Sequence, residues 1–108
     1  MTRIGSWTGM TLVVAVAAAI NGSALAAGDV EHGEQLARRW CSGCHLVARD
    51  QSQASADVPP FSSIARMPNF TPEKIAFFLL DPHPKMPNLG LSRRDADDIA
   101  AYIGSLAK

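Results

Sequence analysis

The chain has 108 residues, with ten basic and ten acidic side chains and a formal net charge of zero at pH 7. This balance argues against a nucleic-acid partner, because such a partner is held by a strongly basic face. The length is that of one small domain, whose apolar core alone is marginal, so we expect disulfides, a metal or a cofactor to add stability.

The N-terminal segment has the composition of an export signal. Arg3 precedes a short apolar run, MTLVVAVAAAI, and Ala24 and Ala26 supply the small side chains that signal peptidase requires. The run is shorter than the roughly 17–25 residues that span a bilayer, which argues against the alternative of an uncleaved anchor. We therefore predict a signal peptide over residues 1–26 and a mature domain over residues 27–108, located in a bacterial periplasm without membrane insertion.

Residues 29–40, DVEHGEQLARRW, are predicted to form the first helix of the mature domain. Asp29 is a suitable N-cap. The residues on the apolar face are Val30, Gly33, Leu36, Ala37 and Trp40. Glycine in a helix interior costs about 1 kcal/mol relative to alanine, so Gly33 should have a packing reason. We expect another helix to approach closely at this residue.

Both cysteines lie in the stretch WCSGCHLV, where Cys41 and Cys44 are three positions apart and His45 follows directly. Zinc needs four ligands, and the other histidines, His32 and His83, are not spaced as a second pair. A redox disulfide would lie beside βαβ elements, which the sequence does not show. Covalent haem attachment uses Cys-x-x-Cys-His and follows export in bacteria. Haem attachment is therefore the preferred interpretation.

The rest of the chain favours helices joined by long loops. Residues 48–60 are polar and small and are predicted to be a loop, followed by a short helical turn over residues 61–67. Thr71 caps a helix that continues through PEKIAFFLL. Ser92 and Asp95 form a capping box that opens the last helix.

Three prolines in DPHPKMPNLG exclude regular structure before that last helix. Loops longer than roughly a dozen residues are uncommon in a compact domain unless they are functional, so the two long loops are expected to wrap around a bound group. The last helix carries an apolar stripe of Ile99, Tyr102, Ile103 and Leu106. No segment alternates like a strand, and the predicted fold class is all-α.

With these motifs, the mature chain resembles the small class I cytochromes c over essentially its whole length. The resemblance lies in the glycine-containing helix that ends at CSGCH, the loop PHPKMPNLGLS and the final helix DIAAYIGSL. It implies a cytochrome c-like fold of three to four helices around one covalently bound haem c. The N- and C-terminal helices would cross, with Gly33 near Tyr102. Many members have an aromatic residue where this chain has Ala37, so Trp40 or Leu36 is expected to fill the space.

The resemblance also implies the residues of the haem site. Cys41 and Cys44 would form thioethers, and His45 would be the proximal ligand of the iron. The carbonyl of Pro59, or that of Pro60, would accept a hydrogen bond from His45 Nδ1 and raise the basicity of the ligand. The aromatic residues expected in the haem pocket or the protein core are Trp40, Phe61, Phe77 and Phe78.

Three side chains are candidates for the second axial ligand of the iron. Met86 lies in the segment most similar to the family's methionine loop, where neighbouring prolines restrict the backbone and limit the entropy lost on ligation. His83 lies in the same loop, between two prolines, and is ranked second. Met67 occurs in a nearly identical tetrapeptide but is expected to fill a gap in the core. Met86 is the predicted ligand.

Iron with histidine and methionine ligands has no open position, so the predicted function is one-electron transfer without enzymatic activity. The expected partners are redox proteins that dock transiently on a monomer. The alternative is a cytochrome subunit of a periplasmic oxidoreductase complex. A third interpretation, in which methionine is absent or labile and the iron reacts with peroxide, would make the protein an enzyme.

Overall fold

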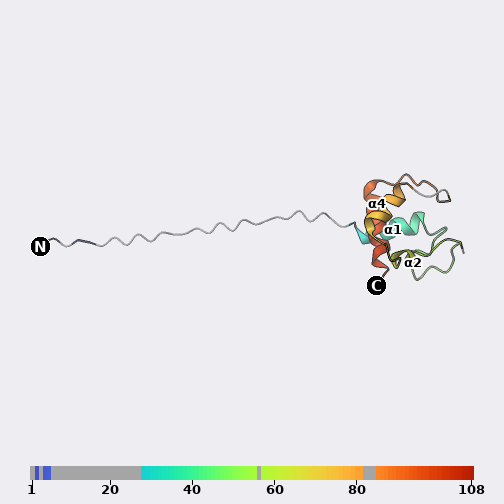
Figure 1. Cartoon of the computed structure of the whole chain (residues 1–108), viewed down its shortest axis with the longest axis horizontal. Helices are drawn as coiled ribbons and strands as arrows, with labels where there is room; N and C mark the ends of the chain where they lie inside the picture. The colour runs from blue at the N-terminus through green and yellow to red at the C-terminus, as the bar shows by residue number, and fades with distance from the viewer. Residues whose placement is uncertain (1, 3, 6–27, 56, 82–84) are drawn as a thin grey trace.

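The computed structural model describes residues 2, 4–5, 28–55, 57–81 and 85–108. Within them the chain forms four α-helices and no strands, so the prediction of an all-α fold is confirmed (Figure 1). The helices are α1 (Val30–Trp40), α2 (Phe61–Ala65), α3 (Pro72–Leu80) and α4 (Arg93–Ser105). Nearly all of the predicted signal peptide, and His83, lie outside the described residues. None of the described helices has the length and apolar character needed to cross a membrane.

The helices begin at the residues that the sequence indicates. Asp29 accepts a hydrogen bond from the backbone N–H of His32, and Thr71 does the same for Lys74. Ser92 and Asp95 form the reciprocal bonds of a capping box at the start of α4. Each bond satisfies a backbone donor that a helix start leaves without an intrahelical partner. These local interactions fix the ends of the elements before any tertiary contact is considered.

Helices α1 and α4 cross with their backbones in direct contact at Gly33. A Cβ atom on Gly33 would lie 1.9 Å from the carbonyl oxygen of Asp98, a distance that only glycine avoids. The predicted crossing is therefore confirmed, but its register differs. The contact is one turn earlier in α4 than Tyr102, because the sequence pattern indicates which helices meet and not where along α4. Gly28 makes a second close approach, since its Cβ would lie 2.2 Å from the carbonyl oxygen of Asp97.

A buried carboxylate joins the start of α1 to the middle of α4. Asp98 is 3% exposed and accepts a hydrogen bond of 2.7 Å from the backbone N–H of Asp29. Its other oxygen lies 2.6 Å from Nδ1 of His32. Burial alone would raise the pKa of Asp98, but the hydrogen bonds from His32 and Asp29 outweigh burial and hold the pKa below its ordinary value of 3.8. The ionised carboxylate of Asp98 thus links the two terminal helices through hydrogen bonds.

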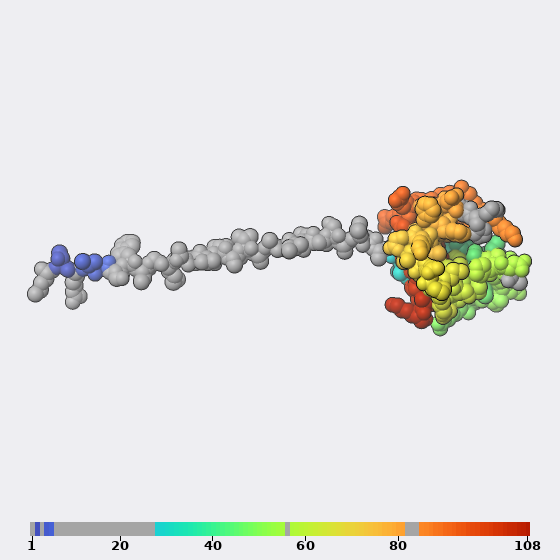
Figure 2. Space-filling view, in the orientation of Figure 1, coloured from blue at the N-terminus to red at the C-terminus, as the bar shows by residue number. Residues whose placement is uncertain are grey.

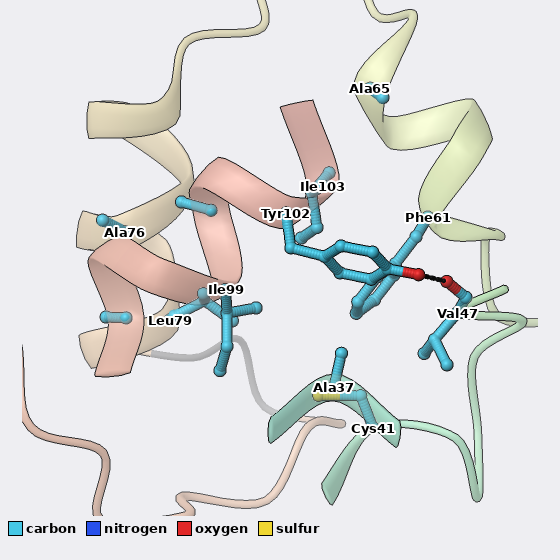
Figure 3. Packing of buried hydrophobic residues seen from close by; sticks show 12 residues of the cluster. Ala37, Cys41, Val47, Phe61, Ala65, Ala76, Leu79, Ile99, Tyr102 and Ile103 are labelled. Atoms are coloured by element: carbon cyan, nitrogen blue, oxygen red, sulfur yellow. Dashed lines mark hydrogen bonds between the residues drawn. The ribbon is translucent and has the colours of Figure 1, made fainter. Parts of the chain in front are cut away.

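Helix α4 contacts all three other helices, and the core lies around it. Ala37 is completely buried and points toward the ring of Tyr102, whose hydroxyl reaches the Val47 carbonyl (Figure 3). Leu36 packs against the core, as predicted, whereas Trp40 is half exposed. The buried apolar residues are Ala37, Cys41, Val47, Phe61, Ala65, Ala76, Leu79, Ala96, Ile99, Ala100, Tyr102 and Ile103.

Several apolar side chains assigned to the core or haem pocket are exposed in the structure. Met67, expected to fill a gap in the core, is 52% exposed in the turn between α2 and α3. Phe77 is 73% exposed, because α3 packs its Ala76 and Leu79 face against the core and Phe77 lies on the opposite face. Phe78 is 44% exposed. The surface of α2 and α3 forms much of the face seen in Figure 2, from yellow-green to gold.

The substitution Gly33→Ala should destabilise the protein although alanine is the better helix former. Its methyl group would collide with the Asp98 carbonyl and force α1 and α4 apart, which typically costs about 1–3 kcal/mol. Denaturant unfolding of the holoprotein measures the change. Gln35→Ala, at an exposed position of the same helix, is the control and should leave the free energy of unfolding nearly unchanged. Equal stability of Gly33→Ala and wild type would refute the close packing of the helices.

The substitution Asp98→Asn should destabilise the protein by about 2 kcal/mol at pH 7, because it removes a hydrogen-bonded buried charge. The folded-state pKa of Asp98 is lowered, so its contribution is complete above the unfolded pKa and is lost as pH falls through the folded pKa. The variant should therefore lose less stability than wild type between about pH 5 and 2. Asp97→Asn makes the same charge change at an exposed site and should retain the wild-type slope.

Candidate functional site

The two cysteines lie in a turn that closes the C-terminal end of α1. Cys41 is the C-cap, and its N–H donates to the Ala37 carbonyl over 2.9 Å. The Cys41 carbonyl accepts from the N–H groups of Cys44, at 3.2 Å, and His45, at 2.9 Å. Cys41 is buried, which raises the pKa of its thiol to about 11, whereas Cys44 is exposed. Cys41 and Cys44 form no disulfide. The turn therefore holds two thiols and an imidazole at the end of one helix.

The ring of His45 has a defined hydrogen-bond partner. Its Nδ1 lies 2.7 Å from the carbonyl oxygen of Pro59. Since a carbonyl only accepts, Nδ1 carries the proton and the lone pair is on Nε2. The Pro60 carbonyl is used otherwise, because it accepts the N–H groups of Ser63 and Ile64 at the start of α2. Of the two prolines that the sequence left open, Pro59 makes the bond.

Phe61 packs beside this imidazole. The two ring centroids are 5.1 Å apart and the planes are inclined by 51°. Phe61 is 3% exposed and opens α2, so the ring is held by the same segment that supplies the Pro59 carbonyl. Trp40 is at the other side of the motif in sequence, half exposed, with the guanidinium of Arg39 4.9 Å from its ring centroid. Trp40 thus lies outside the cluster of buried residues.

The carbonyl groups of residues 44–47 are hydrogen-bonded to three other parts of the chain: the loop before α2, the start of α2, and α4. Four consecutive carbonyls each accept a hydrogen bond: Cys44 from Ser55 N–H at 3.1 Å, His45 from Gln51 Nε2 at 2.8 Å, Leu46 from Phe61 N–H at 2.9 Å, and Val47 from the Tyr102 hydroxyl at 2.5 Å. Burial of the Tyr102 phenol raises its pKa, so the group remains a hydroxyl donor at neutral pH. The segment that carries His45 is therefore fixed over its full length.

Gln51 is a residue of this site that the sequence analysis missed. It lies in a polar stretch that resembles an ordinary surface loop, and no local motif marks it.

An ion pair in the same region joins α1 to the loop, since Arg38 lies 2.9 Å from Glu34 and 3.1 Å from Asp50. Only the folded arrangement shows that the loop after the cysteine motif returns to it.

Met86 comes from a separate element, the segment between α3 and α4. It is partly buried and packs against the core. The Asn88 side chain accepts the N–H of Gly90 at 3.0 Å, and Gly90 has a φ of +63°, which glycine adopts without strain. This turn shapes the segment that leads into α4. The described part of the segment that leads into α4 and the loop before α2 extend from the helices on the same side of the molecule (Figure 1).

The sequence-predicted residues thus fall into two groups. The first is the cluster of Cys41, Cys44, His45, Pro59 and Phe61, which the turn after α1 and the start of α2 bring together. The second is Met86, on the segment before α4. Two cysteine sulfurs, one imidazole with Nε2 available and one thioether have the chemistry that fits haem attachment and ligation.

Two comparisons identify proteins similar to this chain. A family model described as "Cytochrome C oxidase, cbb3-type, subunit III" matches residues 28–103. The chain is 64% identical over 98 residues to "Cytochrome c-552" of Bradyrhizobium diazoefficiens, and the match covers 91% of this chain and 92% of that protein. No solved structure matches it significantly. The family match covers α1, α2, α3, all but the last two residues of α4, and every predicted site residue.

Proposed function

Since the chain belongs to the small monohaem class I cytochromes c of bacteria, we propose that it is a periplasmic one-electron carrier with histidine and methionine as axial haem ligands. The cofactor of this family is a covalently bound haem c, and it is the cofactor of this chain. The relative named cytochrome c-552 supports electron transfer as the function. The observation that carries the proposal is the turn that presents Cys41, Cys44 and an oriented His45 together.

In this proposal Cys41 and Cys44 hold the haem through thioether bonds, and His45 binds the iron through Nε2. The Pro59 carbonyl supports this role, because the bond to Nδ1 fixes the tautomer, orients the ring and makes the imidazole a stronger donor. Phe61 and Trp40 would line the haem pocket next to these ligands. The contact of Phe61 with the His45 ring supports its part in that assignment.

Met86 is the proposed second axial ligand. Its loop position, its partial burial against the core and the ordered Asn88–Gly90 turn beside it support the assignment. A soft thioether favours ferrous iron and raises the reduction potential. With both axial positions filled, the iron exchanges electrons without binding a substrate, so the protein would be a carrier and not an enzyme.

The proposed location and partners follow from the mature domain. The signal-like pattern of residues 1–26 supports export, and Gly28 already packs against α4, which suits a mature chain that begins near residue 27. We expect a monomer that docks weakly and transiently on redox proteins, with no nucleic-acid partner. Electrons would pass through the haem edge near the thioethers, on the side where Cys44 is exposed.

A second candidate function is that of a cytochrome subunit in a periplasmic oxidoreductase complex. Two observations favour it: the matching family model is described as a subunit of an oxidase, and Phe77 and Leu80 are exposed on α3. Exposed apolar side chains that lie together are typical of interfaces. Purification from native membranes and periplasm separates the two functions, because a subunit is recovered with a larger enzyme and a free carrier is recovered alone.

Replacing Cys41 and Cys44 together with alanine should abolish the holoprotein and leave the chain largely unfolded. A domain of this size loses the group that completes its core, and metal ligation is coupled to folding. Intact-mass measurement and circular dichroism on exported protein test both parts. A variant that keeps native helicity and a cooperative thermal transition would contradict the role of haem in the core.

The substitution Met86→Ala should remove the weak long-wavelength ferric band that this family shows only with methionine bound, and should lower the reduction potential. Met67→Ala is the matched control, because it removes a methionine from a nearly identical tetrapeptide, and it should leave both properties nearly unchanged. Optical spectroscopy and redox titration measure them. Retention of the band in Met86→Ala would exclude this residue as the ligand.

A further inference from the structure

The side chain of Gln51 has hydrogen-bond contacts with four backbone groups around the loop that carries His45, and the two hydrogens of its Nε2 are shared among three of them. Its Oε1 accepts the N–H of Val47 at 2.9 Å. Its Nε2 lies within donor distance of three carbonyl oxygens: Ser42 at 2.8 Å, His45 at 2.8 Å and Gln53 at 2.9 Å. These bonds join the cysteine turn to the loop that follows it. No part of the family resemblance assigns a role to this residue.

The surroundings of Gln51 match an amide and no other side chain of similar size. Three acceptors face Nε2 and one donor faces Oε1, which fixes the orientation of the amide. A carboxylate would place an oxygen against three carbonyl oxygens, and a methionine would offer neither a strong donor nor a strong acceptor. The partly buried backbone groups around it would then lose their partners, which is costly.

The contacts of Gln51 lie on both sides of the histidine in sequence. One is to Ser42, between the two cysteines, one is to His45 itself, and one is to Val47, two residues later. The imidazole of His45 is held independently by the Pro59 carbonyl. The backbone of His45 is therefore fixed by Gln51 and its ring by Pro59.

We propose that Gln51 is a positioning residue for the haem ligand His45. By fixing the His45 backbone, it holds the ring at the distance from which Nδ1 donates to Pro59. This inference rests on the proposed function, in which His45 Nε2 binds the iron. The strength of the hydrogen bond at Nδ1 sets the basicity of the imidazole. Gln51 therefore affects the reduction potential of the iron through His45, without contacting the iron.

The direction of the expected change in reduction potential follows from the donor strength of the His45 imidazole. Without the hydrogen bonds of Gln51, the His45 backbone relaxes and the bond from Nδ1 to the Pro59 carbonyl lengthens or bends. The imidazole becomes a weaker donor and stabilises ferric iron less, so the reduction potential rises. The ferric spectrum that reports the orientation of the histidine ring changes as well.

The test uses the full holoprotein and the variant Gln51→Met, which keeps the length of the side chain and removes the amide. Gln53→Met is the matched control, because Gln53 is exposed and contacts Gln51 through its backbone carbonyl only. Redox titration, electron paramagnetic resonance of the ferric form and thermal unfolding are measured on each protein.

The proposal predicts a raised potential and altered resonance in Gln51→Met, with both properties at wild-type values in Gln53→Met. A lower unfolding temperature with wild-type potential and resonance would show a purely structural role and overturn the proposal. If Gln51→Met does not retain haem, Gln51→Asn, whose shorter amide reaches fewer carbonyls, carries the same test. Failure of both to retain haem, with Gln53→Met loaded normally, would also overturn it.

The wild-type protein separates this inference from the proposed function. Ferric resonance without the signature of an axial histidine would refute the role of His45 itself, whatever the Gln51 variants do. A histidine signature in wild type that persists unchanged in Gln51→Met would refute only the role of Gln51.

Discussion

The contact between the backbones of α1 and α4 at Gly33 is the constraint on which the rest of the molecule depends. Because the Asp98 carbonyl approaches to a distance that excludes any Cβ, the two helices have one register with respect to each other. That register places Asp98 over the start of α1 and Tyr102 beside the loop that follows its end. The same crossing thus closes the N-terminal end of α1 and anchors the segment after its C-terminal end.

The segment around His45 shows how an irregular stretch is made rigid without secondary structure. Regular elements satisfy their backbone groups by repetition, whereas here the carbonyls from Cys44 to Val47 have separate partners in the loop before α2, in α2 and in α4. The partners include two backbone amides, one side-chain amide and one buried hydroxyl. Movement of the loop would break bonds to several segments at once, so the ligand shares the rigidity of the whole core.

What the sequence could and could not predict follows from the range of each interaction. Helix starts at Asp29, Thr71 and Ser92 depend on bonds to residues three positions away and were predicted correctly. The close approach at Gly33 was predicted because an unfavourable residue in a helix needs a reason. The register along α4, and the exposure of Met67, depend on tertiary packing that no local pattern encodes. Asp98 and Gln51 were missed for the same reason, since each lies among polar residues that look solvated.

The hydrogen bond between the Asp29 N–H and Asp98 also bears on the order in which contacts form during folding. Its two ends are separated by 69 residues, so the start of α1 gains this partner only when almost the whole chain is present. A polypeptide is synthesised from its N-terminus, and contacts of such long range form late. The cysteine turn is therefore synthesised before the α4 residues that share the buried core with Cys41, and Cys41 becomes buried only when α4 packs against it.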